Sequence, residues 1–300
     1  MAPRDIDGIL LLDKPLGLSS AGAVARAKYL FGARKAGHMG SLDPLASGLL
    51  PICFGEATKF GAQMLDADKT YRVTARLGER TASADRESPV IETRPLADFS
   101  AADMAAALAD FPRDYAQIPP MHSALKQDGK PLYEYARAGI EREREPRAIV
   151  IHAMTLLDWT SPDLHFDVRC SKGAYIRVLA VDIAARLGTI AHLTGLRRLG
   201  VAPFGSETLW SFAALEALSL ADRTAVLLPV DAALGDWRRL DLPAGGVTAV
   251  RRGQAVDWPG CLPGNVRIYA AEHGFLGLGQ VRAAGRLVPL RLISAIANRA

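Results

Sequence analysis

One loop of the sequence displays an acidic side chain in a setting that suits chemistry. Residues 34–48 read RKAGHMGSLDPLASG, with three glycines, one proline and two serines. Such a loop adopts backbone conformations that most residues avoid, and it leaves little bulk around Asp43. A carboxylate displayed in this way can act as a nucleophile, a general base or a metal ligand. The alternative is that Asp43 only caps the turn before Pro44, and the absence of a second ligand at a useful spacing disfavours a metal.

Two other side chains are candidates for the same site. His38 stands five residues before Asp43 and is a candidate base, metal ligand or stacking group, or else an ordinary surface histidine. Tyr71 lies near the start of an alternating segment. It either packs in the core or offers an aromatic surface on which a nucleobase stacks.

A third candidate region reads CSKGAYIR from Cys170 to Arg177 and runs through Gly173 into a predicted helix. Helix N-termini favour anions, and an arginine in the first turn strengthens this preference. Arg177 therefore binds a phosphate, pairs with a buried carboxylate such as Asp43, or is an ordinary surface arginine.

Several familiar catalytic motifs are absent from the sequence. It has no GxGxxG after a strand, no Walker A motif, no GxSxG and no HExxH, which argues against nucleotide cofactors, serine hydrolases and zincins. A hydrolase that uses Asp43 lacks a partner acid or a Ser/His arrangement. The three cysteines lie far apart without CxxC or Cys/His spacing, so we expect reduced thiols and no zinc site.

The elements that must position these residues follow from local patterns. Residues 8–12 form a short apolar run typical of a buried strand, and Ser19 or Ser20 begins a helix that reaches about Phe31 and stops at Gly32. The segment 69–77 alternates, with Tyr71 on its apolar face, which predicts a half-buried strand. Residues 175–187 carry an apolar stripe typical of a helix.

The remaining patterns predict a mixed body. A capping box at Ser100–Asp103 opens a helix to about Phe111, and strands are predicted at about 148–159 and 164–170. Residues 34–48 and 79–88 read as loops. Residues 112–146 read as irregular, except for a helix near 131–138. The pattern is neither strict βαβ alternation nor all-β, so the predicted class is α+β.

Composition sets the general class of protein. The chain has 300 residues, of which 49% are hydrophobic and 23% charged, as expected for one or two packed domains. No apolar run approaches the length of a membrane helix, and acids precede the short apolar run at the N-terminus, unlike a secretory signal. We therefore expect a soluble, cytoplasmic protein without membrane partners.

Charge distinguishes the C-terminal segment from the rest. Residues 241–300 hold seven arginines against three acids, which accounts for the whole net charge of +4. After Pro243 the sequence shows short β-like pieces, near 266–269, 276–281 and 287–292, with no helix expected before the last few residues. We predict a catalytic domain at 1–238 and a small β-barrel at 239–300. A basic module on a neutral body indicates contact with a polyanion, or else only a solvated surface.

Five blocks, in order, resemble bacterial tRNA pseudouridine synthases of the TruB type. They are DKPLGLSS at 13–20, GHMGSLDPLASGL at 37–49, KTY at 69–71 with LG at 77–78 and TASAD at 81–85, CSKGAYIR at 170–177, and LRRL at 196–199. The tail resembles the PUA-type RNA-binding barrel of such enzymes. The resemblance implies an α+β pseudouridine synthase fold with a central mixed, largely antiparallel sheet and a small C-terminal PUA-like β-barrel.

The resemblance also implies an activity and residue roles. The expected reaction is isomerisation of uridine 55 in the T-loop of tRNA, by base flipping and an aspartate-dependent glycosidic rearrangement. Asp43 matches the nucleophile, Tyr71 the tyrosine that stacks on uracil and is a candidate for removing the C5 proton, and Arg177 the arginine that pairs with the aspartate. The expected RNA-contacting or pocket residues are His38, Tyr175, Leu196, Lys14 and Asp85. Ser41, Ser47 and Ala174 depart mildly from the family's usual residues.

The implied chemistry needs no cofactor and no metal, because breaking N1–C1′ and joining C5–C1′ consumes no redox equivalents. The expected partner is the T-arm stem-loop of tRNA, with no obligatory protein partner. Two other readings stay open: an RNA-binding or RNA-folding module that retains the fold, and a guide-RNA-dependent relative. The intact Asp43, Tyr71 and Arg177 set disfavours the first, and the insert between Asp98 and Trp159 disfavours the second.

Overall fold

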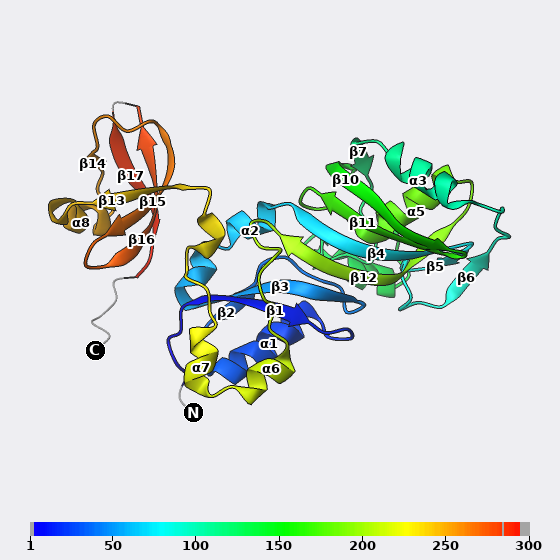
Figure 1. Ribbon diagram of the computed structural model, residues 1–300, viewed down its shortest axis with the longest axis horizontal. Helices are drawn as coiled ribbons and strands as arrows, with labels where there is room; N and C mark the ends of the chain where they lie inside the picture. The colour runs from blue at the N-terminus through cyan, green and yellow to red at the C-terminus, as the bar shows by residue number, and fades with distance from the viewer. Residues whose placement is uncertain (1–2, 284, 295–300) are drawn as a thin grey trace.

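The computed structural model describes residues 3–283 and 285–294, and its main body is built on one large sheet (Figure 1). The sheet has eight strands in the order β1-β3-β12-β4-β11-β10-β7, with β2 also paired to β3. Neighbours are antiparallel except β3 and β12, which run parallel. The strands are β1 (Gly8–Lys14), β2 (Ala36–His38), β3 (Ala46–Phe54), β4 (Lys69–Leu77), β7 (Asp114–Gln117), β10 (Arg147–Thr160), β11 (Asp163–Cys170) and β12 (Ala191–Val201). The predicted mixed, largely antiparallel sheet is confirmed.

Helices α1 and α3 begin at the predicted capping residues. Helix α1 (Ser20–Phe31) follows Ser19, whose hydroxyl accepts a hydrogen bond from the Gly22 amide, and it ends at Gly32 in the left-handed conformation. Helix α3 (Ala101–Ala109) starts with the predicted capping box between Ser100 and Asp103. Helix α5 (Ile176–Arg186) packs its apolar stripe into the main core.

Strand β4 shows the predicted alternation. Tyr71, Val73, Ala75 and Leu77 are buried, and the residues between them are partly or fully exposed. Because β4 lies between β11 and β12, this buried face lies at the centre of the main core, and Tyr71 lies at one end of it.

Three segments differ from the sequence-based expectation. Residues 34–48 are not all loop, because 36–38 pair with β3 and β3 itself starts at Ala46. The segment 79–88 contains β5, which pairs with β6. The segment 112–146 contains β7 and a small hairpin. These strands are only two to four residues long, too short for an alternating pattern to reveal, and β2 and β7 also pair with more distant strands. The elements are β5 (Glu79–Thr81), β6 (Val90–Thr93), β8 (Lys126–Gln127), β9 (Lys130–Pro131) and α4 (Leu132–Arg137).

The C-terminal part forms a second sheet with its own core. Its five strands lie in the order β13-β15-β16-β17-β14 and bury a separate cluster that includes Val266, Ile268 and Leu287. The expectation of no helix was wrong, because α8 (Ala244–Arg251) packs against this sheet; its two glycines, Gly245 and Gly246, hid it. The helix expected in the last few residues lies outside the described part of the chain. The strands are β13 (Arg238–Leu242), β14 (Val256–Asp257), β15 (Gly264–Ala270), β16 (Gly274–Arg282) and β17 (Arg286–Leu292).

The second sheet lies beyond one end of the main body (Figure 1). Phe60 packs edge-on against Phe275 with ring centroids 5.3 Å apart, and Arg267 forms an ion pair of 2.9 Å with Asp231. Three short helical elements lie in the chain between β12 and β13: α6 (Phe212–Ala217), α7 (Leu220–Ala225) and η2 (Ala232–Leu234). Two more, η1 (Gly55–Lys59) and α2 (Ala62–Asp66), join β3 to β4. None of the described helices is long and apolar enough to cross a membrane.

Candidate active site

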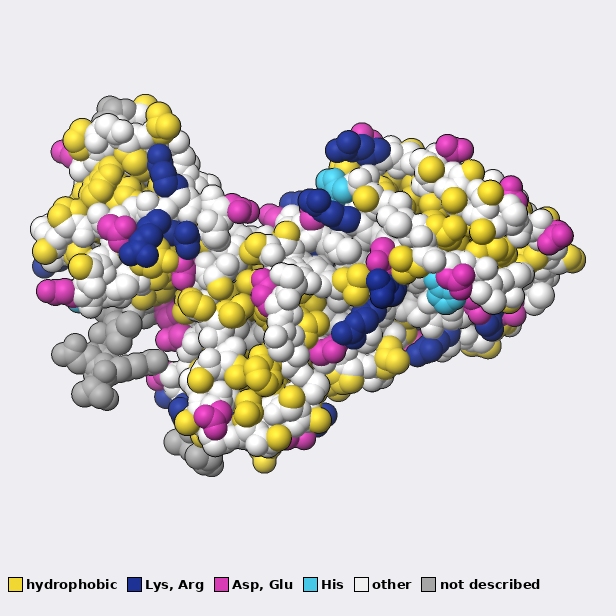
Figure 2. All heavy atoms as spheres, viewed as in Figure 1, with side chains coloured by type: hydrophobic (Ala, Val, Ile, Leu, Met, Phe, Trp, Pro, Cys, Tyr) yellow, Lys and Arg dark blue, Asp and Glu magenta, His cyan; other side chains and the backbone are white. Residues whose placement is uncertain are grey.

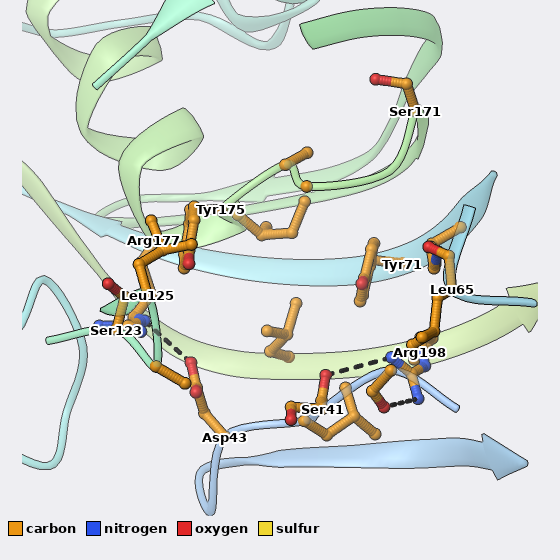
Figure 3. Close-up of a pocket in the computed structure, with 18 of the residues that line it drawn as sticks. Ser41, Asp43, Leu65, Tyr71, Ser123, Leu125, Ser171, Tyr175, Arg177 and Arg198 are labelled. Carbon is orange, nitrogen blue, oxygen red and sulfur yellow. Dashed lines mark hydrogen bonds and ion pairs between the residues drawn. The ribbon is translucent and has the colours of Figure 1, made fainter. Parts of the chain in front are cut away.

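A cavity of about 290 Å³ opens where the loop before β3, strands β4 and β12, the start of α5 and the insert meet (Figure 3). Five of the residues that the sequence singled out line it: Asp43, Tyr71, Tyr175, Arg177 and Leu196. They come from four segments far apart in the chain. The fold therefore brings together most of the predicted site.

Asp43 and Arg177 form an ion pair in the cavity. Arg177 Nε lies 3.0 Å from Asp43 Oδ2. The arginine side chain is only 4% exposed, whereas that of Asp43 is 42% exposed. Arg177 also donates to the carbonyl oxygens of Ser83, at 3.1 Å, and His122, at 2.7 Å. The arginine is thus fixed by its surroundings, and it orients the Asp43 carboxylate while leaving it accessible to a substrate.

Asp85 lies behind this pair. Its Oδ2 is 3.6 Å from Arg177 Nε, and its Oδ1 accepts hydrogen bonds from Ser83 Oγ, at 2.5 Å, and from the Glu87 amide, at 3.0 Å. Asp85 is 3% exposed and does not line the cavity. Burial, followed by the negative charges of Asp85 and Asp43, raises the pKa of Glu87. Asp85 therefore contributes by holding Arg177, and its predicted RNA contact stays a prediction.

Tyr71 points into the cavity from β4 (Figure 3). It is 8% exposed, and burial raises the pKa of its hydroxyl, while the positive charge and hydrogen bond of Arg198 partly oppose that shift. The hydroxyl is therefore protonated at neutral pH. Its ring is placed to pack against a planar group that enters beside Asp43.

Arg198 is a residue of the site that sequence reasoning missed. It is 1% exposed and donates to the carbonyl oxygens of Leu49 at 2.7 Å, Gly40 at 3.1 Å and Ser41 at 3.3 Å. It thereby holds the loop that carries Asp43. The adjacent residues Arg197 and Arg198 are a sequence signal for a buried arginine, because neighbouring side chains of a strand point to opposite faces of the sheet. Only the register of β12 decides which of the two is buried.

Tyr175 and Leu196 line the cavity from different elements. Tyr175 immediately precedes α5 (Figure 3), and burial raises the pKa of its hydroxyl. Leu196 is 8% exposed, and its parallel pairing with Ala46 sets it beside the Asp43 loop. Both residues give the cavity apolar surface.

The structure places Lys14 and His38 outside the lining of the cavity. Lys14 is fully buried and donates from Nζ to the carbonyls of Leu18, at 2.6 Å, and Pro15, at 2.9 Å. Burial lowers its pKa to about 8, and the charge of Asp43 counters that shift. His38 lies in β2, half-buried. Burial and then Arg198 lower its pKa, and its Nδ1 has no hydrogen-bond partner within the described residues.

The insert supplies a wall of the cavity that the sequence did not reveal. Ser123, Ala124 and Leu125 line the cavity, and the His122 carbonyl holds Arg177. Lys69 and Arg147 add positive charge to the lining. Within residues 3–283 and 285–294, no group of three His, Cys, Asp or Glu side chains is placed to hold a metal ion.

Structural and sequence comparisons identify the class. The fold matches a chain in the crystal structure of a Cbf5–Nop10–Gar1 complex with a TM-score of 0.71 and 24% identity, covering 96% of this chain and 84% of that one. A chain of an H/ACA RNP bound to a substrate RNA matches with a TM-score of 0.70 and 23% identity, covering 95% and 84%. These matches establish the pseudouridine synthase fold, here with a PUA-like C-terminal sheet.

The particular family follows from the sequence matches. Residues 28–176 match the N-terminal domain of the TruB family of pseudouridylate synthases, and 177–235 and 239–293 match C-terminal domains of TruB enzymes. The chain is 50% identical to a tRNA pseudouridine synthase B from Burkholderia mallei, covering 98% of this chain and 99% of the relative. It is 47% identical to one from Sodalis glossinidius, covering 97% and 96%. The chain belongs to the TruB family and is a pseudouridine synthase, an isomerase.

Proposed function

We propose that the enzyme converts uridine 55 in the T-loop of tRNA to pseudouridine. The observation that carries the proposal is a partly exposed Asp43, held 3.0 Å from the buried Arg177 and facing Tyr71 in a cavity with room for one nucleoside. The relatives at 47–50% identity are named tRNA pseudouridine synthase B, which supports tRNA as the substrate.

The proposed reaction starts with extrusion of the target uridine. A stacked uridine hides its glycosidic bond, so the base must be flipped out, at a cost of a few kcal/mol. Stacking on Tyr71 returns about 1–3 kcal/mol. Leu196 and Tyr175 would enclose the base, and His38, Lys14 and Asp85 are proposed to shape the entrance and contact the RNA loop.

Asp43 then acts on the flipped nucleotide, by attack on C1′ or C6 or by assisting a glycal route. The N1–C1′ bond breaks, the uracil turns, and C5 bonds to C1′. The C5 proton passes to the Tyr71 oxygen while the Tyr71 hydroxyl gives its own proton to water, and N1 takes one proton back from water, so the protons balance. Arg177, 3.0 Å away, holds the Asp43 carboxylate in place during these steps. The atoms of substrate and product balance without a cofactor.

We also propose that the two parts of the chain have different roles. Residues 1–238 would carry the chemistry, and residues 239–300 would bind RNA, because the excess positive charge lies there. The proposed partner is the T-arm stem-loop alone, without an obligatory protein partner. A pure RNA-binding module is the rival function, and the complete Asp43–Arg177–Tyr71 arrangement supports catalysis instead.

The test is tritium release from unmodified tRNA transcript labelled with [5-³H]uridine, using purified protein alone. We expect release with the wild type and none with Asp43→Asn, whose tRNA affinity should stay within roughly tenfold because the change preserves shape. A transcript with cytidine at position 55 should give no release. Turnover by Asp43→Asn would remove Asp43 from the nucleophile role, and tight binding without release by the wild type would favour the rival function.

A further inference from the structure

A buried glutamine that does not line the cavity grips the start of the helix that carries Arg177. Gln117 ends β7 and is 2% exposed. Its Oε1 accepts a hydrogen bond from the Tyr175 amide at 2.7 Å, and its Nε2 donates to the Tyr175 carbonyl at 3.1 Å. Nε2 also donates to the Tyr115 hydroxyl. The side chain thus pairs with the backbone of Tyr175 much as a neighbouring strand would.

This pairing fixes the entry into α5. Tyr175 is the residue before the helix, with extended backbone at φ −97° and ψ 106°. Its side chain makes no capping hydrogen bond to the first turn of the helix. Arg177 follows two residues later, in the first turn, and reaches Asp43. A shift of the Tyr175 backbone would therefore move both the Tyr175 ring and the Arg177 guanidinium relative to Asp43.

The side-chain amide of Gln117 satisfies its three partners together, because it carries one acceptor and two donors. The Tyr175 amide needs an acceptor, whereas its carbonyl needs a donor, and a buried backbone group left without a partner is costly. A carboxylate at this position would face the carbonyl with a second acceptor, and an apolar side chain would leave both backbone groups unpaired. The chemistry of the position is therefore specific to glutamine rather than to a buried side chain of that size.

We propose that Gln117 is a positioning residue for the isomerisation, which it supports by setting the Tyr175–Arg177 segment against Asp43. The inference rests on the roles proposed above for Asp43 and Arg177. It also gives the insert a function in catalysis, because β7 belongs to the segment that forms one wall of the cavity.

The test uses Gln117→Met, which keeps the length of the side chain and loses all three hydrogen bonds. We expect the single-turnover rate on tRNA to fall by about 100-fold, because small displacements of reacting groups cost rates of that order. The tRNA dissociation constant should change less than threefold. Hydrogen exchange at the Tyr175 amide should become faster, while exchange across β4 stays as in the wild type. Gln127→Met is the matched control, because the Gln127 amide bonds within the insert, to the Glu143 carbonyl.

A Gln117→Met protein with wild-type rate and wild-type exchange would overturn the proposal, as would parallel losses of rate and tRNA affinity. If that variant does not fold, Gln117→Asn replaces it, since its amide is one methylene shorter and cannot reach both backbone groups of Tyr175 as Gln117 does. It should then lose at least tenfold in rate, and a wild-type rate would overturn the proposal. A wild type inactive on tRNA would refute the proposed function instead, and amide exchange would still test Gln117.

Discussion

At the scale of single residues, the two arginines of the site differ from Asp43 in how far they are buried. Arg177 and Arg198 are almost wholly buried, and their guanidinium groups donate hydrogen bonds to backbone carbonyls. The side chain of Asp43, by contrast, is 42% exposed. Guanidinium groups suit this use because their donors point in fixed directions and they stay charged on burial. The carboxylate that we propose to react is therefore held by buried arginines that backbone carbonyls fix in place.

The two adjacent arginines of β12 allow a matched comparison. Arg198→Met should lower the free energy of unfolding by about 3 kcal/mol, because it removes three hydrogen bonds from a buried charged donor to backbone carbonyls, at roughly 1 kcal/mol each. Arg197→Met removes an exposed pair with Asp13 and should cost under about 1 kcal/mol. Urea denaturation measures both, and equal losses would contradict the assigned role of Arg198.

Lys69 gives a pH-dependent prediction. Its Nζ donates to the carbonyls of Ala67, Leu65 and Met64, and burial lowers its pKa from 10.5 to about 8. Between these two pH values the unfolded chain holds a proton that the folded chain has lost, so stability rises with pH. Relative to Lys69→Met, the wild type should gain up to about 3 kcal/mol from pH 8 to 10.5, at about 1.4 kcal/mol for each pKa unit. Urea unfolding of both proteins across this range measures the difference, and parallel pH profiles would count against the shift.

At the scale of elements, the Asp43 loop depends on one tight junction. Strands β3 and β12 run parallel at 46–48 and 196–198, and Gly48 lies at their contact with φ +98°. A Cβ atom there would lie 2.2 Å from the Arg198 carbonyl oxygen. The strands approach closely enough to bind the loop only because position 48 has no side chain.

Gly48→Ala should therefore cost more than about 4 kcal/mol, or prevent folding, because the strands must separate or the backbone must change. Gly139→Ala is its control: φ is +70° there as well, but open space surrounds the site. That change should cost only about 1–2 kcal/mol, for the left-handed backbone alone. Thermal or urea unfolding measures the stability of both variants. Similar losses of stability would show that the left-handed backbone, and not the close approach of β3 and β12, determines the cost at Gly48.

At the scale of the whole molecule, the C-terminal sheet packs directly against the main body as well as being joined to it by the chain. Phe60 packs on Phe275, Arg267 pairs with Asp231, and Lys59 donates to the Leu292 carbonyl and to Ser294. Arginine side chains gather on this part of the surface (Figure 2). The docking sets those charges at a fixed distance from the cavity, as recognition of one folded RNA would require.

Arg282 and Arg286 test the proposed RNA-binding role in the full-length chain. They pair across the β16–β17 hairpin, and two like charges side by side suit a polyanion. Replacing both with Gln should reduce the slope of log binding constant against log salt by about two, if each contacts one phosphate. The single-turnover rate at saturating tRNA should be unchanged. An unaltered slope would exclude this hairpin from the RNA interface.

The sequence by itself determined a large part of this protein. The caps of α1 and α3, the alternation of β4 and the apolar stripe of α5 are local features, and each appeared as expected. The motif blocks identified the family and the candidate set of Asp43, Tyr71 and Arg177, because unusual residue types at fixed spacings are visible without a fold.

Only the tertiary structure decided how those residues meet. The inward turn of Arg198 depends on the register of β12, the wall from Ser123 to Leu125 depends on how the insert folds back, and the grip of Gln117 on Tyr175 joins positions 58 residues apart. His38 and Lys14 lie outside the cavity lining for the same reason. Local patterns report the secondary structure that a segment prefers, but pairing between distant segments is set by packing and backbone hydrogen bonds that no local pattern records.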